Sequence, residues 1–284
     1  MAVRFPLKSL ALIVSAGLFL TACDQQEQAP PEPRVAQAEA DATVTPGAAP
    51  TPSASAEETA ESVQRKAVVR TYADIAHATY QDALRTAQEL DKAVDELIAN
   101  PSEGTLEAAR EAWLKARVPY QQSEVFRFGN PVVDEWEGQL NAWPLDEGLI
   151  DYVASDDYEH EMGNEGANAN IIASEEINIG GTTHDVRELT PKLLAELNEV
   201  GGSEANVATG YHAIEFLLWG QDRNGFERGN GNRPATDYAR GDECTHGHCE
   251  RRGEYLDAAT DLLVQDLEWM IQQWAQMTGL QGRQ

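Results

Sequence analysis

The most informative stretch of the sequence is GYHAIEFLLW, residues 210–219, which sets a histidine and a carboxylate three residues apart in an apolar run. On an α-helix, residues i and i+3 lie on the same face, so we expect His212 and Glu215 to point the same way. Their neighbours are almost all apolar, which predicts a buried helix with the pair inside a helical bundle. A buried ionisable pair needs a partner, a metal ion or a shifted pKa.

The same spacing is also typical of a core histidine that only fixes helix packing by a hydrogen bond to a glutamate. The zinc-protease pattern H-E-x-x-H is absent, and the inverted pattern fails because Phe216 follows Glu215. Spacing alone therefore leaves packing and metal binding as alternatives for His212 and Glu215.

The first 22 residues are typical of an export signal. A basic start precedes an apolar segment, residues 10–20, that is too short for a membrane-spanning helix. Residues 20–23, LTAC, resemble a bacterial lipobox, and this resemblance implies cleavage before Cys23 and lipid on its thiol. We expect the chain to be anchored through Cys23 in the cell envelope, facing the periplasm, in the inner or the outer membrane. Asp24 resembles an inner-membrane retention signal; a secretory signal with a chance cysteine is the alternative.

Composition divides the rest of the chain into two parts. Residues 23–61 are rich in Ala, Pro, Glu, Gln, Ser and Thr, with no aromatic residue and no apolar periodicity. Such a segment buries too little surface to offset the entropy of ordering, so we expect a disordered tether. Residues 62–284 carry helical patterns and are expected to form the folded domain.

The chain is strongly acidic. It has 48 Asp and Glu against 21 Lys and Arg, a formal net charge of -27. Nucleic acids would be repelled, which excludes them as partners, whereas cationic ligands would be attracted. Because the acids are spread along the whole chain, an acidic, solvated surface without a specific ligand is the alternative.

Apolar periodicity predicts five or six helices and no β-strand of any length. In residues 62–99 the predicted face is formed by Val68, Tyr72, Ile75, Tyr80, Leu84, Leu90, Val94 and Leu97. Further helices are expected over 105–126, with a kink at about Arg117 caused by Pro119, and over 186–200, 203–219 and 253–277. Residues 220–252 are expected to form a long ordered loop. The fold class is therefore all-α, a helical bundle with functional side chains in its interior.

Several long stretches resemble the imelysin-like family, also called peptidase M75, and are closest to its iron-regulated protein A group. They are W-x3-R-x2-Y-x3-E at 113–124 with FRFG at 126–129, NAWPLDEGLIDY at 141–152, GYHAIEFLLWG at 210–220, RPxTDY at 233–238, and the segment from Cys244 to Arg252. Together they cover most of residues 65–265.

The resemblance implies an exported protein of two pseudo-repeated helical bundles, in which the G-x-H-x-x-E helix lines a site near their junction. Members of the family are linked to iron acquisition or, by name, to metal-dependent peptidase activity. Because family members generally extend beyond the cysteine segment, whereas this sequence stops at Gln284, we expect mainly the N-terminal half of the two-bundle fold.

Carried onto this sequence, the family motif implies His212 and Glu215 as metal ligands. Glu124 is the third candidate, since it ends the polar stripe of a helix expected to pack beside them and a metal needs a further donor. Arg117 would hold Glu124 or a ligand carboxylate, with a structural salt bridge as the alternative. The remaining supporting residues are Tyr120, expected to pack, Asp146, expected to cap the segment after it, and Gly210.

Two cysteines remain besides Cys23. In an exported protein Cys244 and Cys249 are expected to form a disulfide. His246 and His248 lie between them, so a zinc site is the alternative.

The favoured function is a periplasm-facing binding protein that takes up iron, another metal ion or a metal-bearing ligand and works with an envelope transport partner. The first alternative is a metallopeptidase, with zinc as its metal and Glu215 as base or ligand. The second is an envelope scaffold in which the pair of His212 and Glu215 only packs.

Overall fold

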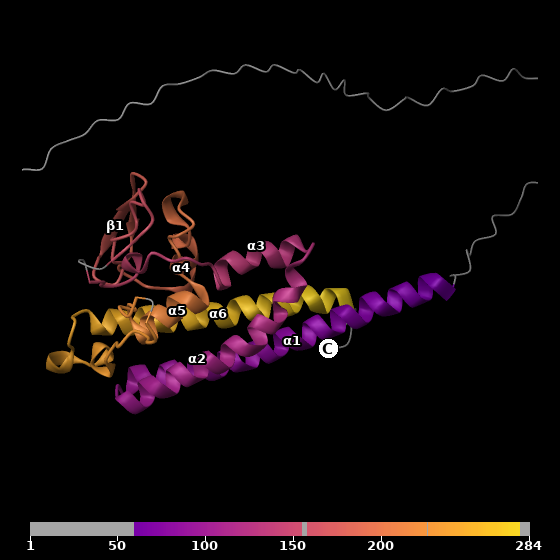
Figure 1. The fold of residues 1–284 in the computed structure, drawn as a ribbon, viewed down its shortest axis with the longest axis horizontal. Helices are drawn as coiled ribbons and strands as arrows, with labels where there is room; N and C mark the ends of the chain where they lie inside the picture. Colours follow the sequence, from indigo (N-terminus) through magenta and orange to yellow (C-terminus); the bar gives the residue numbers. More distant parts are fainter. Residues whose placement is uncertain (1–59, 155–157, 226, 279–284) are drawn as a thin grey trace, which may run out of the picture. The chain divides into compact units, whose positions relative to one another are not determined.

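The structure is a computed structural model that describes residues 60–154, 158–225 and 227–278 (Figure 1). Contacts divide the chain into Met1–Ala56, which lies outside the described residues, and Glu57–Gln284. The α-helices are α1 Ala60–Ala99, α2 Glu103–Ser123, α3 Pro131–Leu140, α4 Pro191–Leu197, α5 Gly210–Trp219 and α6 Cys249–Thr278. The strands are β1 Glu176–Ile179 and β2 Thr182–Asp185, and the 3-10 turns are η1 Glu124–Arg127, η2 Glu147–Leu149, η3 Val200–Gly202, η4 Ala235–Tyr238 and η5 Gly241–Glu243.

Three long helices form the frame: α1 packs against both α2 and α6, as Figure 1 shows. The face that α1 buries is built largely from small residues, at Ala73, Ala76, Tyr80, Ala83, Ala87, Leu90, Val94 and Leu97. The predicted face is therefore wrong at its start, because Val68, Tyr72 and Ile75 are exposed. Alanines with little apolar surface were overlooked, although they let neighbouring helices approach closely.

Local signals explain where α2 begins and ends. The Ser102 hydroxyl oxygen accepts a hydrogen bond from the Thr105 backbone N–H, and the Ser102 backbone N–H donates to Thr105 Oγ1. This capping box starts the helix at Glu103. The helix runs through Pro119 and passes into η1 at Glu124.

The helix α5 is shorter than predicted. It begins at Gly210 and not at residue 203, because Thr209 is extended and Gly210 has a φ of 77°. A side chain at Gly210 would place its Cβ 2.3 Å from the Leu140 carbonyl oxygen, so only glycine lets α5 start against the end of α3. From there α5 packs between α2 and α6, with Tyr211, Ile214 and Leu217 buried.

The expectation of no strand is wrong for residues 176–185. β1 and β2 pair antiparallel, with Ile179 opposite Thr182. Gly180 and Gly181 join them, both at positive φ, which is the geometry of a two-residue hairpin turn. A Gly-Gly pair between short runs is a hairpin signal, and the four-residue strands were too short to show alternation.

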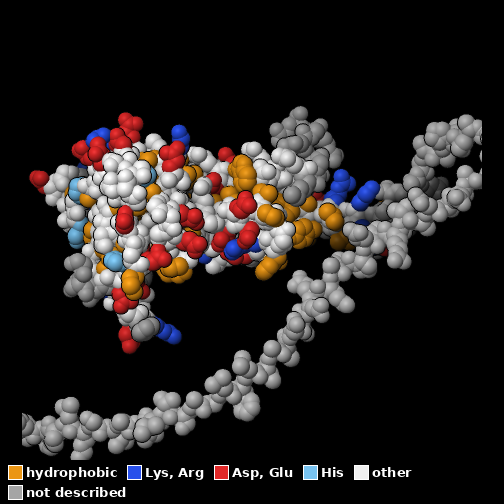
Figure 2. Space-filling model, turned by 90° about the horizontal axis from the view of Figure 1, so that it is seen from above, with side chains coloured by type: hydrophobic (Ala, Val, Ile, Leu, Met, Phe, Trp, Pro, Cys, Tyr) orange, Lys and Arg blue, Asp and Glu red, His pale blue; other side chains and the backbone are white. Residues whose placement is uncertain are grey.

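With this small hairpin as the exception, the all-α helical bundle is confirmed in the described part of the chain. The predicted helix over 186–200 contracts to α4, because Thr190 accepts a hydrogen bond from the Leu193 N–H and so caps its start. Among the residues that the structure covers, no helix combines the length and the apolar character needed to cross a membrane. Acidic side chains are scattered over the face shown in Figure 2.

Candidate functional site

The helix α5 presents His212 and Glu215 on one face. The His212 ring Nδ1 lies 2.8 Å from Glu215 Oε2, and because a carboxylate only accepts, Nδ1–H is the donor. In the neutral imidazole, Nε2 of His212 then carries the lone pair. The prediction that the pair is enclosed in the bundle is wrong, since the side chains of His212 and Glu215 are 17% and 41% exposed. Only the other faces of α5 are buried, so this face is open to a ligand.

The pair lies in the wall of a cavity of about 500 Å³. The cavity is lined by residues of α2, the segment 143–147, α5 and the loop after it: Glu107, Arg110, Trp113, Leu114, Trp143, Leu145, Glu147, His212, Glu215, Phe216, Trp219, Gly220, Asp222, Gly229, Asn230 and Gly231. The Trp143 ring lies against the His212 ring, with their centroids 5.0 Å apart. Aromatic and acidic side chains therefore share one small space.

Negative charge gathers in the cavity around Glu147. Burial raises the pKa of this carboxyl to about 7, and the charges of Asp222 and Glu215 act in the same direction, against the lowering effect of Arg233. A cation placed near Glu147 would lower the pKa of this buried carboxyl and favour its ionised form. The cavity is thus electrostatically suited to a positively charged ligand.

The side chains of α2 hold α5 in place behind the cavity. Arg110 donates through Nε and Nη2 to the Leu218 carbonyl oxygen, at 3.1 and 2.9 Å, and Trp113 donates through Nε1 to the Tyr211 oxygen at 2.9 Å. The Trp113 and Trp219 rings meet edge to face at 5.3 Å. The contacts with α2 therefore hold the helix that carries His212 and Glu215 in a fixed position.

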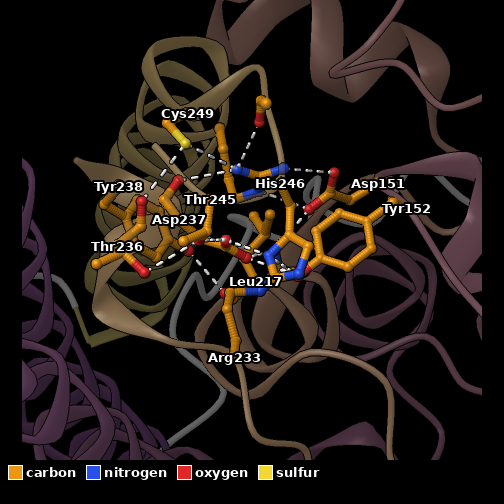
Figure 3. A network of polar contacts seen from close by, with 12 residues as sticks. Asp151, Tyr152, Leu217, Arg233, Thr236, Asp237, Tyr238, Thr245, His246 and Cys249 are labelled. Atoms are coloured by element: carbon orange, nitrogen blue, oxygen red, sulfur yellow. Dashed lines mark hydrogen bonds and ion pairs between the residues drawn. The ribbon is translucent and has the colours of Figure 1, made fainter. Parts of the chain in front are cut away.

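A buried ionic network fixes the loop that follows α5 (Figure 3). Asp151 accepts from Arg233 at 2.7 Å and from Arg252 at 2.7 and 3.1 Å. Asp237 also accepts from Arg233, at 3.1 Å, and from the Tyr152 hydroxyl, at 2.6 Å. Because the acids and arginines have side chains that are at most 2% exposed, each charge depends on its partners.

The network is joined to α5 by backbone contacts. The Arg233 N–H donates to the Trp219 oxygen at 2.9 Å, and the Tyr238 hydroxyl donates to the Leu217 oxygen at 2.6 Å. The C-terminal end of α5, at Leu217 and Trp219, is therefore held by residues of the segment 233–238.

The structure does not bring Glu124 to His212 and Glu215. Glu124 opens η1 and pairs with Arg127 at 3.5 Å, in a separate surface pocket. Arg117 does not contact Glu124 directly: it donates to Asn141 Oδ1, while Asn141 Nδ2 donates to Glu124 Oε1 at 3.2 Å. The guanidinium of Arg117 also lies over the Tyr211 ring, 5.1 Å from its centroid. These two residues thus support packing beside α5 and lie outside the cavity lining.

The other supporting residues have structural positions. Tyr120 is 2% exposed and packs on Tyr211, with ring centroids 4.7 Å apart, and burial raises its pKa well above the usual value. Asp146 precedes η2, but its side chain makes no cap; instead it accepts from the Glu161 N–H at 3.1 Å and from Asn164 at 2.6 Å. Asp146 therefore holds a loop, and the adjacent Glu147 is the carboxylate that lines the cavity.

Cys244 and Cys249 form a disulfide in the structure, with 2.01 Å between the sulfurs. Zinc would need free thiolates, which the disulfide removes. His246, between them, is tied through Nδ1 to Asp237 Oδ1 at 2.6 Å. Cys23 lies outside the described residues.

The donors in the cavity match part of a metal site. His212 offers Nε2 in the arrangement in which a carboxylate orients a ligating histidine through the other nitrogen. In the described residues, however, no group of three or more His, Cys, Asp and Glu is close enough to hold a metal ion. The described residues thus bring together one imidazole and the carboxylate that orients it.

Sequence reasoning missed Glu147, Asp222, Trp143 and Trp219 as cavity residues. Glu147 and Trp143 lie in the segment 141–152, and Trp219 lies in the segment 210–220. Both segments resemble the family, which was the available signal. The sequence does not show that these side chains line the same cavity, because that depends on the tertiary structure.

The imelysin family model, peptidase M75, matches residues 76–283. Iron-regulated protein A of Synechococcus elongatus is 32% identical over 92 residues, which are 32% of this chain and 26% of that protein. A solved structure from Parabacteroides distasonis, provisionally named an iron-regulated protein A precursor, is 24% identical with a TM-score of 0.47 and covers 78% of this chain. The chain in turn covers 46% of that structure's chain, so it spans less than half the length of either relative.

Proposed function

Because the chain belongs to the imelysin family, we propose that it is a binding protein for iron or another transition metal, which it holds in the cavity beside His212. One observation carries the proposal: Glu215 fixes the His212 ring through Nδ1, at 2.8 Å, and both residues line the cavity. Imidazole and carboxylate together suit iron among the first-row metals. A similar protein bears the name iron-regulated protein A, which supports iron as the metal.

His212 would ligate the metal through Nε2, and Glu215, bonded to Nδ1, would orient the ring. The carboxylates of Glu147 and Asp222 line the same cavity and would add negative charge around it. The bound metal would be cargo for an envelope transport partner.

The test measures bound iron after the purified chain is equilibrated with Fe²⁺ under anaerobic conditions. His212→Ala should lose the bound iron, and Glu215→Gln should weaken its binding, because the ring is then less firmly oriented. The matched control is His160→Ala, since His160 is exposed and lies outside the cavity lining. Equal iron in the wild type and in His212→Ala would refute the proposal.

Attachment to the envelope is a separate part of the proposal. The lipobox-like residues 20–23 and the tether that follows support export with lipid on Cys23. Fractionation of cells should place the wild-type chain with membranes and Cys23→Ser outside them. A membrane-bound Cys23→Ser chain would contradict lipid anchoring at this residue.

The metallopeptidase alternative is favoured by Glu147. A general base works best with a pKa near neutral pH, and burial brings that of Glu147 to about 7. Cleavage of denatured casein that EDTA abolishes and that Glu147→Gln or Glu215→Gln removes would establish this activity. Unchanged cleavage in both variants would assign it to a contaminant.

A further inference from the structure

We infer that the ligand of this cavity is a metal chelate, a metal ion carried by a neutral or positively charged organic molecule with a flat apolar surface, and not a bare metal ion. The inference rests on the proposed function and names the chemical class of its ligand. Cavity size, the donors of the protein, the aromatic walls and the charge each support it.

The cavity is larger than a hydrated ion requires. Its volume is about 500 Å³, whereas six waters at about 30 Å³ each occupy about 180 Å³. Volumes of about 300–1,000 Å³ are typical of cavities that bind small organic molecules. A hydrated ion would therefore leave most of this space to unbound water.

The described residues also offer fewer donors than a bare ion needs. Transition metals in proteins take about four to six ligands. Here His212 supplies Nε2, Glu215 is engaged with the same ring, and the described residues contain no cluster of three candidate ligands. The organic part of a chelate would provide the missing donors, and His212 would occupy a position that the chelator leaves open.

Aromatic rings form much of the wall. Trp113, Trp143, Phe216 and Trp219 all line the cavity. Trp143 is 67% exposed, although such a large ring gains free energy when it is covered. A flat apolar group placed against Trp143 would remove this surface from water, and a positive charge near the indole would add a cation–π attraction.

The acidic lining of the cavity favours neutral or cationic chelates over anionic ones. Glu107, Glu147, Glu215 and Asp222 line it together with a single arginine, Arg110. The guanidinium of Arg110 is already held by the carbonyl oxygens of Leu218 and Arg233. A chelate rich in carboxylates would be repelled by this lining, whereas a neutral or cationic one would be attracted.

The experiment compares three forms of one metal on the purified full chain in detergent, by calorimetry and tryptophan fluorescence. The probes are aqueous Ni²⁺, the cationic aromatic 1:1 complex of Ni²⁺ with terpyridine, and the anionic complex with nitrilotriacetate; both complexes keep open coordination positions. We expect the terpyridine complex to bind at least about 10-fold more tightly than either other form. Trp143→Ala should weaken it about 10-fold, while Trp269→Ala, which removes an exposed tryptophan of α6, should leave it unchanged.

The other outcomes contradict either the chelate inference or the proposed metal binding. If aqueous Ni²⁺ or the nitrilotriacetate complex binds as tightly as the terpyridine complex, or if Trp143→Ala has no effect, the chelate inference fails while the proposed metal binding stands. If metal-free terpyridine binds as tightly as its complex, the ligand is an organic molecule without metal. If no form binds, or if His212→Ala changes none of them, the proposed function itself fails.

Discussion

Replacing Glu147 with glutamine should make the protein more stable at alkaline pH relative to the wild type. The carboxyl of Glu147 has an ordinary pKa of 4.5, which burial raises to about 7 in the folded chain. Between these values the folded state binds more protons than the unfolded state, so the free energy of unfolding falls as the pH rises from about 5 to 8. Glutamine is neutral throughout and lacks this penalty.

The magnitude follows from the difference between the two pKa values. At about 1.4 kcal/mol per pKa unit, the upper limit is about 3.5 kcal/mol, and screening by solvent at the cavity wall reduces it to about 1–2 kcal/mol. Other carboxyls change stability in the same direction: burial raises the pKa of Asp266 to about 6. The informative quantity is therefore the difference between wild type and variant at each pH.

The assay is urea unfolding at pH 5, 6, 7 and 8 in the presence of EDTA, since a bound cation would stabilise the ionised carboxyl. The wild type should lose about 1–2 kcal/mol more between pH 5 and 8 than Glu147→Gln. Glu135→Gln removes an exposed carboxyl of α3 and serves as the control, with a profile parallel to that of the wild type. Parallel profiles for Glu147→Gln and the wild type would refute the electrostatic description of the cavity.

Three further changes test the frame around the site by thermal and urea unfolding. Gly210→Ala should lower the free energy of unfolding by about 2–4 kcal/mol, because residue 210 has a positive φ and the added Cβ would collide with a backbone oxygen of α3. Gly104→Ala in α2 should be neutral or stabilising, and equal effects of the two changes would contradict this reasoning. Asp151→Asn should cost about 3–5 kcal/mol by leaving two buried arginines undercompensated, and a loss below about 1 kcal/mol would show that the network is dispensable. Replacing Cys244 and Cys249 with serine should cost about 2 kcal/mol by the loop-entropy rule, and unchanged stability would argue against an intact disulfide in solution.

Most of the helical fold could be predicted because apolar periodicity and helix caps are local. The spacing of apolar residues placed α1, α2 and α6 to within a few residues. The errors arose where local signals were weak. Alanines on the buried face of α1 carry little hydrophobic signal, and the hairpin around Gly180 and Gly181 has strands of four residues.

The pairing of His212 with Glu215 was also a local prediction, since an i, i+3 spacing on a helix determines which side chains share a face. Sequence spacing carries no comparable information on the distance between different helices. For that reason Glu124, on the adjacent helical segment, was a reasonable third ligand, and yet it pairs with Arg127 outside the cavity.

The local sequence of this chain thus determines the helices and the face of α5 that carries the imidazole and the carboxylate. It also places the two disulfide cysteines five residues apart. The cavity itself depends on the tertiary structure, because it forms where segments about 100 residues apart in the sequence pack together. Glu107 comes from α2, Trp143 from the segment before η2, Glu147 from the start of η2, and Asp222 from the loop after α5. Their convergence depends on helix packing and on the buried ionic network of Asp151, and such long-range contacts leave no periodic signal in the order of the residues.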